Sequence, residues 1–133
     1  MPPSNLPPKS RQPESPPGLH LMGNLYGCQC DSTFLIDPQL LARHCRQLVA
    51  DAGLHAVGEL FHPFGGESGV TGVIVLAESH LSRHTWPESR HVTLDVYVCN
   101  HSGDNRDKAQ RLFDALMATF RADEPHLWRI DRA

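Results

Sequence analysis

The sequence VTGVIVLAESHLSRHTWPE, which spans residues 70–88, places a continuous apolar run directly before a segment rich in reactive side chains. The run Val70–Ala77 predicts a buried β-strand, because it is short, rich in valine and preceded by a glycine-rich segment. The segment Glu78–Glu88 combines hydroxyl, imidazole and indole side chains with a proline. A rigid strand is a common support for a functional site. The stretch therefore predicts a central strand and a site at its end.

The segments on either side of this stretch predict an α+β fold. Patterns typical of strands occur at residues 19–26, 56–64, 70–77, 92–98 and 127–131. Two amphipathic helices are predicted between them, one beginning at Asp37-Pro38 and one at Asp104 or Asn105. The order β-α-β-β-β-α-β favours a two-layer α/β sandwich, in which an antiparallel sheet carries both helices on one face.

Length, charge and cysteine content narrow the class of protein. The chain has 133 residues, is 40% hydrophobic and carries a formal net charge of -3, which predicts one domain and no nucleic-acid partner. No apolar run approaches the roughly 20 residues of a membrane span, and no apolar signal segment opens the chain, so no membrane association is expected. Four scattered cysteines are too few for a disulfide framework. A cytoplasmic protein with free thiols is the expectation.

Residues 1–17 form a separate, proline-rich segment. They hold seven of the eleven prolines and few apolar residues. Such a segment cannot bury enough surface to offset the entropy lost on ordering, so a flexible tail is predicted. The folded domain is then expected to cover residues 18–133.

The nine histidines and four cysteines raise the possibility of a metal site. Cys28 and Cys30 lack the two-residue gap of a zinc knuckle, and no second pair matches them. His80 and His84 are four residues apart, but the preceding strand and Pro87 argue against a helix that would present both. We therefore expect no metal.

The spacing of Glu78-Ser79, His84 and Cys99 resembles the self-processing motif of the bacterial S-adenosylmethionine decarboxylases. His84 follows Ser79 by five positions and Cys99 follows it by twenty. Taken singly, such residues usually have structural roles, such as a capped turn or a small buried side chain. The resemblance covers roughly residues 18–131 and extends to four more segments: Leu25–Cys28, Phe61–Phe64, Gly69–Val73 and Leu94–Cys99.

The resemblance implies that the chain cuts itself between Glu78 and Ser79, giving fragments 1–78 and 79–133. Ser79 would become a pyruvoyl group, which acts as an electron sink during decarboxylation. Serine suits this role because its oxygen serves first as nucleophile and then as leaving group. The resemblance gives His84 a part in cofactor formation and Cys99 a part in turnover, and Thr71 stands where the family typically has serine.

The separation of Thr71 from Ser79 suggests an assembly. Eight residues on an extended segment span about 26 Å, so Thr71 cannot reach its own Ser79 unless the strand folds back. The resemblance likewise implies a homodimer with composite sites. Ser79 and Cys99 would come from one protomer, and Thr71 and His84 from its partner.

The resemblance implies S-adenosylmethionine as the small-molecule substrate, giving the aminopropyl donor for spermidine synthesis. Phe64 and Trp86 suit an adenine ring and a sulfonium cation, and Glu88 suits ribose hydroxyls. All three would lie on the partner's side of the site.

Two alternatives remain open. Relatives with the same processing motif decarboxylate arginine or ornithine, and Glu67 in a lengthened loop is a candidate partner for a basic side chain. The second alternative is an unprocessed homologue that acts as a binding or regulatory subunit. The chain departs from the family at Asn24, at Arg83, where an apolar residue is usual, and at Ser89–His91.

Overall fold

The structure, a computed structural model, describes residues 17–65, 68–77, 79–100 and 103–132. The tail expected at residues 1–17 therefore lies almost wholly outside the described residues. The elements in chain order are β1 (Gly18–Cys28), α1 (Thr33–Ile36), α2 (Pro38–Asp51), β2 (Ala56–Pro63), β3 (Val70–Leu76), β4 (Ser79–Trp86), the 3₁₀ turn η3 (Pro87–Ser89), β5 (His91–Val98), α3 (Arg106–Phe120) and β6 (Ala122–Arg132).

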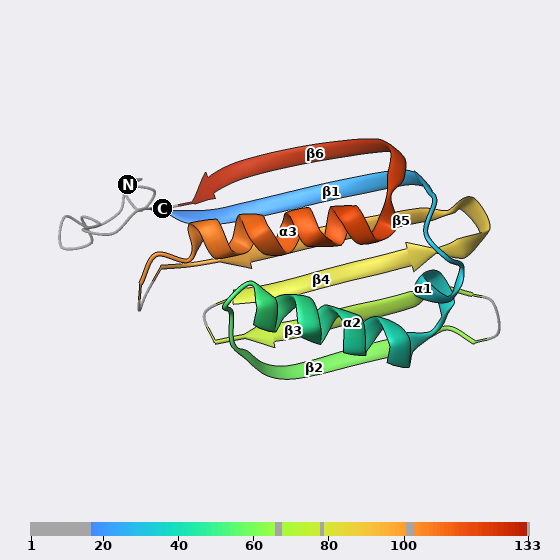
Figure 1. Ribbon diagram of the computed structural model, residues 1–133, viewed down its shortest axis with the longest axis horizontal. Helices are drawn as coiled ribbons and strands as arrows, with labels where there is room; N and C mark the ends of the chain where they lie inside the picture. The colour runs from blue at the N-terminus through green and yellow to red at the C-terminus, as the bar shows by residue number, and fades with distance from the viewer. Residues whose placement is uncertain (1–16, 66–67, 78, 101–102, 133) are drawn as a thin grey trace, which may run out of the picture.

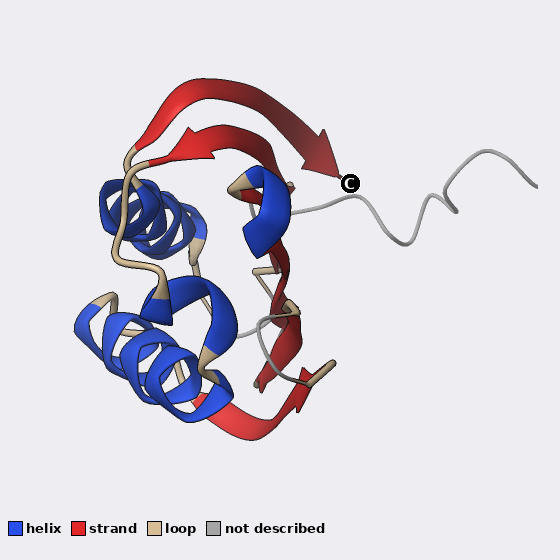
Figure 2. Ribbon diagram, turned by 90° about the vertical axis from the view of Figure 1, so that its right-hand side faces the viewer, coloured by secondary structure: helices blue, strands red, loops and turns tan. Residues whose placement is uncertain are grey.

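The six strands form one antiparallel sheet in the order β2-β3-β4-β5-β1-β6 (Figure 1). Figure 2 shows α2 and α3 on the same side of this sheet, which bends around them. Alternate strand residues and one stripe of each long helix fill the space between the layers, as the periods of strands and helices require. Leu25, Ile74, Val96 and Leu116 are among the residues with no measurable exposure there. The predicted α+β sandwich with two long helices on one face is confirmed.

The predicted element order is wrong in that it omits β4. The segment Ser79–Trp86 was expected as a site at the end of a strand, and it is itself a strand between β3 and β5. Its inward residues are Leu81, Arg83 and Thr85, all buried. Arg83 and Thr85 hide the alternation of apolar residues that identifies a half-buried strand. The short helix α1 was also not predicted.

Local sequence signals mark where the two long helices begin. The side chain of Asp37 accepts hydrogen bonds from the backbone N–H groups of Gln39 (3.0 Å) and Leu40 (3.1 Å), so the predicted N-cap of α2 is confirmed. Asn105 occupies the N-cap position of α3, one of the two predicted positions. The Asp104 side chain accepts a hydrogen bond from the backbone N–H of Arg106 at 3.0 Å.

The sheet face opposite the long helices is called the open face below. It carries polar and titratable side chains at its centre and several exposed apolar ones: Leu60, Val75, Trp86, Trp128 and Ile130. No helix in the described parts of the chain is long and apolar enough to cross a membrane.

Candidate active site

Strand β4 carries two of the four predicted catalytic residues, Ser79 at its start and His84 toward its end. Ser79 is its first residue and pairs with Leu76 of β3, whereas His84 pairs with Thr71. Ser79 and His84 are five residues apart, about 17 Å at the rise of an antiparallel strand. One chain therefore presents two half-sites, a Ser79 end and a His84 end.

The assumption that residues 71–79 run straight is wrong, because the chain turns after Leu76 and returns as β4. The turn brings His84 rather than Ser79 opposite Thr71. The inferred separation of Thr71 from its own Ser79 thus holds for a different reason, which is the register of the β3–β4 hairpin.

Cys99 lies at the Ser79 end. Ser79 pairs with Val98, the last residue of β5, and half-buried Cys99 follows directly. The side chain of Asn105 donates a hydrogen bond to the backbone carbonyl of Cys99 (2.9 Å), and its backbone N–H donates to the side chain of Asn100 (2.8 Å). The start of α3 thereby fixes the backbone that carries Cys99.

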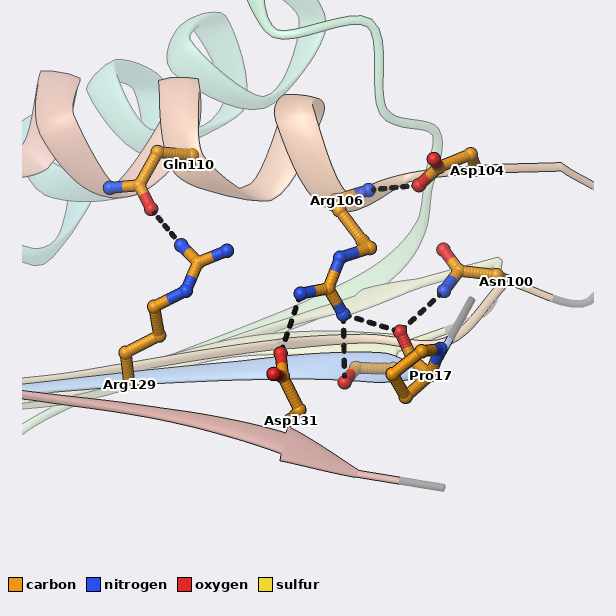
Figure 3. A network of polar contacts seen from close by, with 8 residues as sticks. Pro17, Asn100, Asp104, Arg106, Gln110, Arg129 and Asp131 are labelled. Atoms are coloured by element: carbon orange, nitrogen blue, oxygen red, sulfur yellow. Dashed lines mark hydrogen bonds and ion pairs between the residues drawn. The ribbon is translucent and has the colours of Figure 1, made fainter. Parts of the chain in front are cut away.

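A second set of contacts ties this end to β1 and β6 (Figure 3). The carbonyl of Pro17 accepts hydrogen bonds from Asn100 (2.8 Å) and from the guanidinium of Arg106 (2.6 Å). Arg106 also forms an ion pair with Asp131 at 2.5 Å, and this contact lowers the pKa of the Asp131 carboxyl. Side chains from the loop and helix after β5 thus connect three segments around the Ser79 end.

Ser79 borders a small hollow between the sheet and α3. The hollow has a volume of about 160 Å³, and Asn105, the N-cap of α3, and Lys108 of α3 lie on its wall with Leu76, Ala77 and residues 53–55. Ser79 itself is half-buried. A cofactor made from the chain itself must be accessible to a small molecule. Ser79, which starts β4 and borders a hollow, meets this requirement. Glu78 lies outside the described residues.

The His84 end joins Thr71 to an imidazole. The hydroxyl of Thr71 and Nδ1 of His84 lie 2.9 Å apart and share a hydrogen bond. His84 also lines a hollow of about 430 Å³ on the open face, with Asn24, Asp95 and Trp128 among its other lining residues. Thr71 and His84 are therefore brought together, as predicted, and His84 faces a space large enough for a ligand.

Buried Thr85 holds this end in place. Its hydroxyl accepts a hydrogen bond from the backbone N–H of Val70 (2.8 Å) and donates one to the carbonyl of Leu35 in α1 (2.6 Å). Gly69 packs so closely here that a Cβ would lie 1.8 Å from the Thr85 carbonyl oxygen. This close approach requires glycine.

The predicted substrate-binding residues cluster near the His84 end. Trp86 is 40% exposed and lies at the end of β4, and Glu88 lies in η3 beside a hollow of about 310 Å³. Phe64 is exposed and follows β2, where its backbone N–H bonds to Gly69 at 3.0 Å. Glu67 lies outside the described residues.

A cluster of polar side chains on the open face next to Ser79 was not predicted from the sequence. Nε2 of His20 lies 2.5 Å from the Asp95 carboxylate, and Nε2 of His80 lies 3.5 Å from the same oxygen. The ring of Tyr97 lies 5.5 Å from His20 and 5.8 Å from His80. The alternation of residues 92–98 already placed Asp95 and Tyr97 on one face, but β1 and β4 bring the two histidines from distant positions.

A buried arginine lies behind the His84 end, on the helix side of β4. Arg83 is 1% exposed, and its guanidinium lies 5.6 Å from the ring centre of Phe61 and 5.5 Å from that of Phe120. Its three side-chain nitrogens have no hydrogen-bond partner among the described residues. Burial lowers the pKa of Arg83, and the Arg83 charge adds to burial in lowering the pKa of His44.

The cysteines near β1 have the properties of buried thiols. Burial raises the pKa of Cys28 to about 11 and also raises that of Cys30, so both are protonated at neutral pH. In the described ranges, no three His, Cys, Asp or Glu side chains are grouped so that they could hold a metal ion.

Comparisons with known proteins agree with this geometry. Residues 19–133 match the S-adenosylmethionine decarboxylase family. A relative from Pyrobaculum aerophilum named S-adenosylmethionine decarboxylase proenzyme is 39% identical over 118 residues, which cover 87% of this chain and 88% of the relative. A proenzyme of the same name from a Hydrogenobaculum species is 43% identical over 101 residues, covering 75% of this chain and 69% of the relative.

A solved structure supports the same assignment at the level of the fold. The crystal structure of the adenosylmethionine decarboxylase from Aquifex aeolicus has a TM-score of 0.78 and 30% sequence identity, and the match covers 90% of this chain and 92% of that one. The matches in sequence and fold extend over nearly all of the domain that carries the two half-sites. The chain belongs to the S-adenosylmethionine decarboxylase family.

Proposed function

We propose that this protein decarboxylates S-adenosylmethionine with a pyruvoyl group made from its own Ser79, in a homodimer whose sites each combine two half-sites. The observation that carries the proposal is the position of the half-sites on β4. Ser79 and Cys99 lie at one end, and Thr71, His84 and Trp86 lie at the other. The product would be the aminopropyl donor used in spermidine synthesis.

Maturation begins at Ser79. Oγ of Ser79 attacks the carbonyl carbon of Glu78, so that an ester replaces the peptide bond and the Ser79 nitrogen becomes an amine. Removal of the Ser79 Cα proton then breaks the bond between Cβ and Oγ, and Glu78 leaves as a carboxylate. The resulting dehydroalanine takes up water and releases ammonia, which leaves a pyruvoyl group at the start of β4.

The His84 end supplies the groups that assist this step. An imidazole accepts a proton near neutral pH, so His84 of the partner subunit is the proposed base for the Cα proton. Thr71 holds one nitrogen of that imidazole at 2.9 Å, which orients the other nitrogen. His84 lies five positions along the strand from the Ser79 of its own chain, so a two-fold partner is the source that the geometry favours.

The open face supports a dimer. Exposed apolar side chains on it include Val75, Trp86, Trp128 and Ile130, and such surface is favourable to bury in an interface. His84 and Trp86 lie on this same face. A second copy packed here would cover these apolar side chains.

In turnover, the pyruvoyl group would supply an electron sink for the bond that loses carbon dioxide. The residues of this chain then bind the substrate and deliver a proton. Cys99 is the proposed donor of the proton that replaces the lost carboxyl group, and Asn105 fixes its backbone. Trp86 and Phe64 would stack on adenine, and Glu88 would accept hydrogen bonds from the ribose hydroxyls.

Intact mass spectrometry and product analysis test the proposal. The purified protein should consist of residues 1–78 and of a 79–133 fragment that carries a pyruvoyl group, whereas Ser79→Ala should stay at full length. Cys99→Ala should be cut and yet release little carbon dioxide from S-adenosylmethionine. A wild-type chain that stays uncut would contradict the enzymatic proposal and favour a binding subunit.

A substrate comparison tests the alternative of an arginine or ornithine decarboxylase. S-adenosylmethionine, arginine and ornithine are offered at equal concentration to the processed enzyme, and kcat/KM is measured by release of carbon dioxide. A higher value for arginine or ornithine would overturn the substrate while leaving the maturation step intact. We place the protein in the cytoplasm, where its buried thiols would remain reduced.

A further inference from the structure

Four aromatic rings form a row across the open face at the His84 end. Tyr26 of β1 stacks on His91 of β5, with ring centres 4.5 Å apart and planes inclined by 16°. The other neighbour of His91 is Trp86 of β4, with ring centres 5.0 Å apart and planes inclined by 22°. The ring of His84 follows at 5.9 Å from Trp86. His91 thus touches both Tyr26 and the indole.

The backbone explains why His91 meets Trp86. The two residues are paired across β4 and β5 on either side of η3. The turn between them ends at Arg90, whose φ of 49° is in the left-handed region. The guanidinium of Arg90 donates hydrogen bonds to the carbonyls of Cys28 (2.5 Å) and Cys30, which anchors the turn to the end of β1. The backbone of this turn is therefore held in place, and this fixes the direction in which its side chains point.

His91 serves as a flat packing surface rather than as a hydrogen-bonding group. Its Nε2 is buried and has no hydrogen-bond partner among the described residues. Burial also lowers the pKa of His91, which favours the neutral ring. A neutral imidazole between two aromatic rings gains its stabilisation from stacking, and offset or near-parallel ring pairs are favourable at these distances.

We infer that His91 is a positioning residue for substrate recognition, because it holds the plane of Trp86 so that the indole can stack on the adenine of the substrate. The inference rests on the proposed function. His91 covers part of the indole, and Trp86 keeps 40% exposure for a ligand. A ring already held in place loses less side-chain entropy when the ligand binds.

The inference predicts a change in KM more than in kcat. His91→Ala should raise KM for S-adenosylmethionine about two- to tenfold, the range that corresponds to a ring stack of roughly 0.5–1.5 kcal/mol. The value of kcat should stay within about twofold, since His91 touches no reacting atom. His91→Phe preserves a flat apolar ring and should restore KM. Tyr26→Ala removes the ring behind His91 and should also raise KM, by a smaller factor.

Fluorescence gives a readout that does not depend on turnover. The chain has two tryptophans, so Trp128→Phe leaves Trp86 as the single reporter. In that background, His91→Ala should increase acrylamide quenching of Trp86, and His91→Phe should not. Binding of 5′-methylthioadenosine, an adenine nucleoside without the reactive carboxylate, should weaken in His91→Ala by the same factor as KM. Thermal melting of every variant shows whether it folds.

Three outcomes would overturn the inference. One is an unchanged KM in a folded His91→Ala enzyme whose wild-type parent turns over. Another is an equal increase in KM for His91→Phe and His91→Ala, since the imidazole would then act by something other than stacking. The third is an unchanged quenching of Trp86. A wild-type enzyme that releases no carbon dioxide from S-adenosylmethionine instead overturns the proposed function, and the quenching experiment still reports on the contact between His91 and Trp86.

Discussion

The two ends of β4 are held in place by different kinds of interaction. At the Ser79 end, side chains of the loop after β5 and of α3 bond to backbone carbonyls, as Asn105 does to Cys99 and Asn100 does to Pro17. At the His84 end, ring stacking on the open face and the buried Thr85 hydroxyl dominate. The first end is held by side-chain hydrogen bonds to neighbouring segments, and the second combines the hydrogen bonds of Thr85 with ring stacking.

This difference fits the roles that we propose for the two ends. The proposed maturation would change the covalent structure at Ser79, and hydrogen bonds to neighbouring segments would keep the new chain end in the sheet after the cut. The His84 end makes no covalent change and presents planar rings to a ligand. The following experiments disturb one end at a time, and the largest expected effect comes first.

Mixing two damaged chains tests whether the ends act across a dimer. His84→Ala alone should be uncut and Cys99→Ala alone should be cut but inactive. In a mixed dimer, Ser79 and Cys99 of the His84→Ala chain meet Thr71 and His84 of the Cys99→Ala chain. That site is intact, so activity should rise to about a quarter of wild type under random pairing.

The covalent readout makes this experiment sharper. With chains of different mass, cleavage of the His84→Ala chain should appear only when the Cys99→Ala chain is co-expressed. Co-expression with a chain that carries both substitutions is the matched control and should give no cleavage. Uncut His84→Ala chains in verified mixed dimers would contradict the shared site.

Replacing the buried arginine tests the packing behind the His84 end. Arg83 has no hydrogen-bond partner among the described residues, and a buried charge without one is costly. Arg83→Met should increase the free energy of unfolding by about 1–4 kcal/mol, the range seen when apolar residues replace buried ionic groups. Urea denaturation measures the change. A loss of stability would mean that the contacts with Phe61 and Phe120 outweigh the desolvation cost.

Two glycines provide a matched pair: Gly69 lies at the His84 end, and Gly58 of β2 lies opposite Val75, nearer to the Ser79 end. Gly69→Ala places a methyl group against the carbonyl of Thr85 and should cost about 1–3 kcal/mol, because backbone atoms must move. Gly58→Ala adds the same methyl group where no atom lies within 4 Å and should be nearly neutral. Thermal melting compares the two. Equal changes in melting temperature would mean that the close contact at Gly69 does not make alanine unfavourable there.

The smallest expected effect is a pH dependence from His44. Burial first and the Arg83 charge second lower the pKa of His44 below its ordinary value of 6.5. The unfolded chain then binds more protons than the folded one in this window, so stability falls as pH drops below about 6.5. In Arg83→Met the His44 pKa should rise toward the ordinary value, as NMR titration would show. No rise would indicate that burial alone sets the pKa.

Much of this molecule could be predicted from the sequence, because the signals are local. Asp37 before Pro38 marks a helix start, and the alternation of residues 92–98 marks a strand with one apolar face. The spacing of Ser79, His84 and Cys99 identified the family, which the comparisons confirm. The role of each of these residues remains a prediction for the experiments above.

The family resemblance already grouped Thr71 with His84, but the tertiary structure alone decided which side chains meet and how. Thr71 meets His84, and His91 meets Trp86, because of the registers of β3, β4 and β5. Register depends on which side chains of β4 face the core, and there the charge of Arg83 hides the apolar pattern that a sequence would show. Long-range pairing is fixed by burial over the whole sheet, so no short stretch of the sequence contains it.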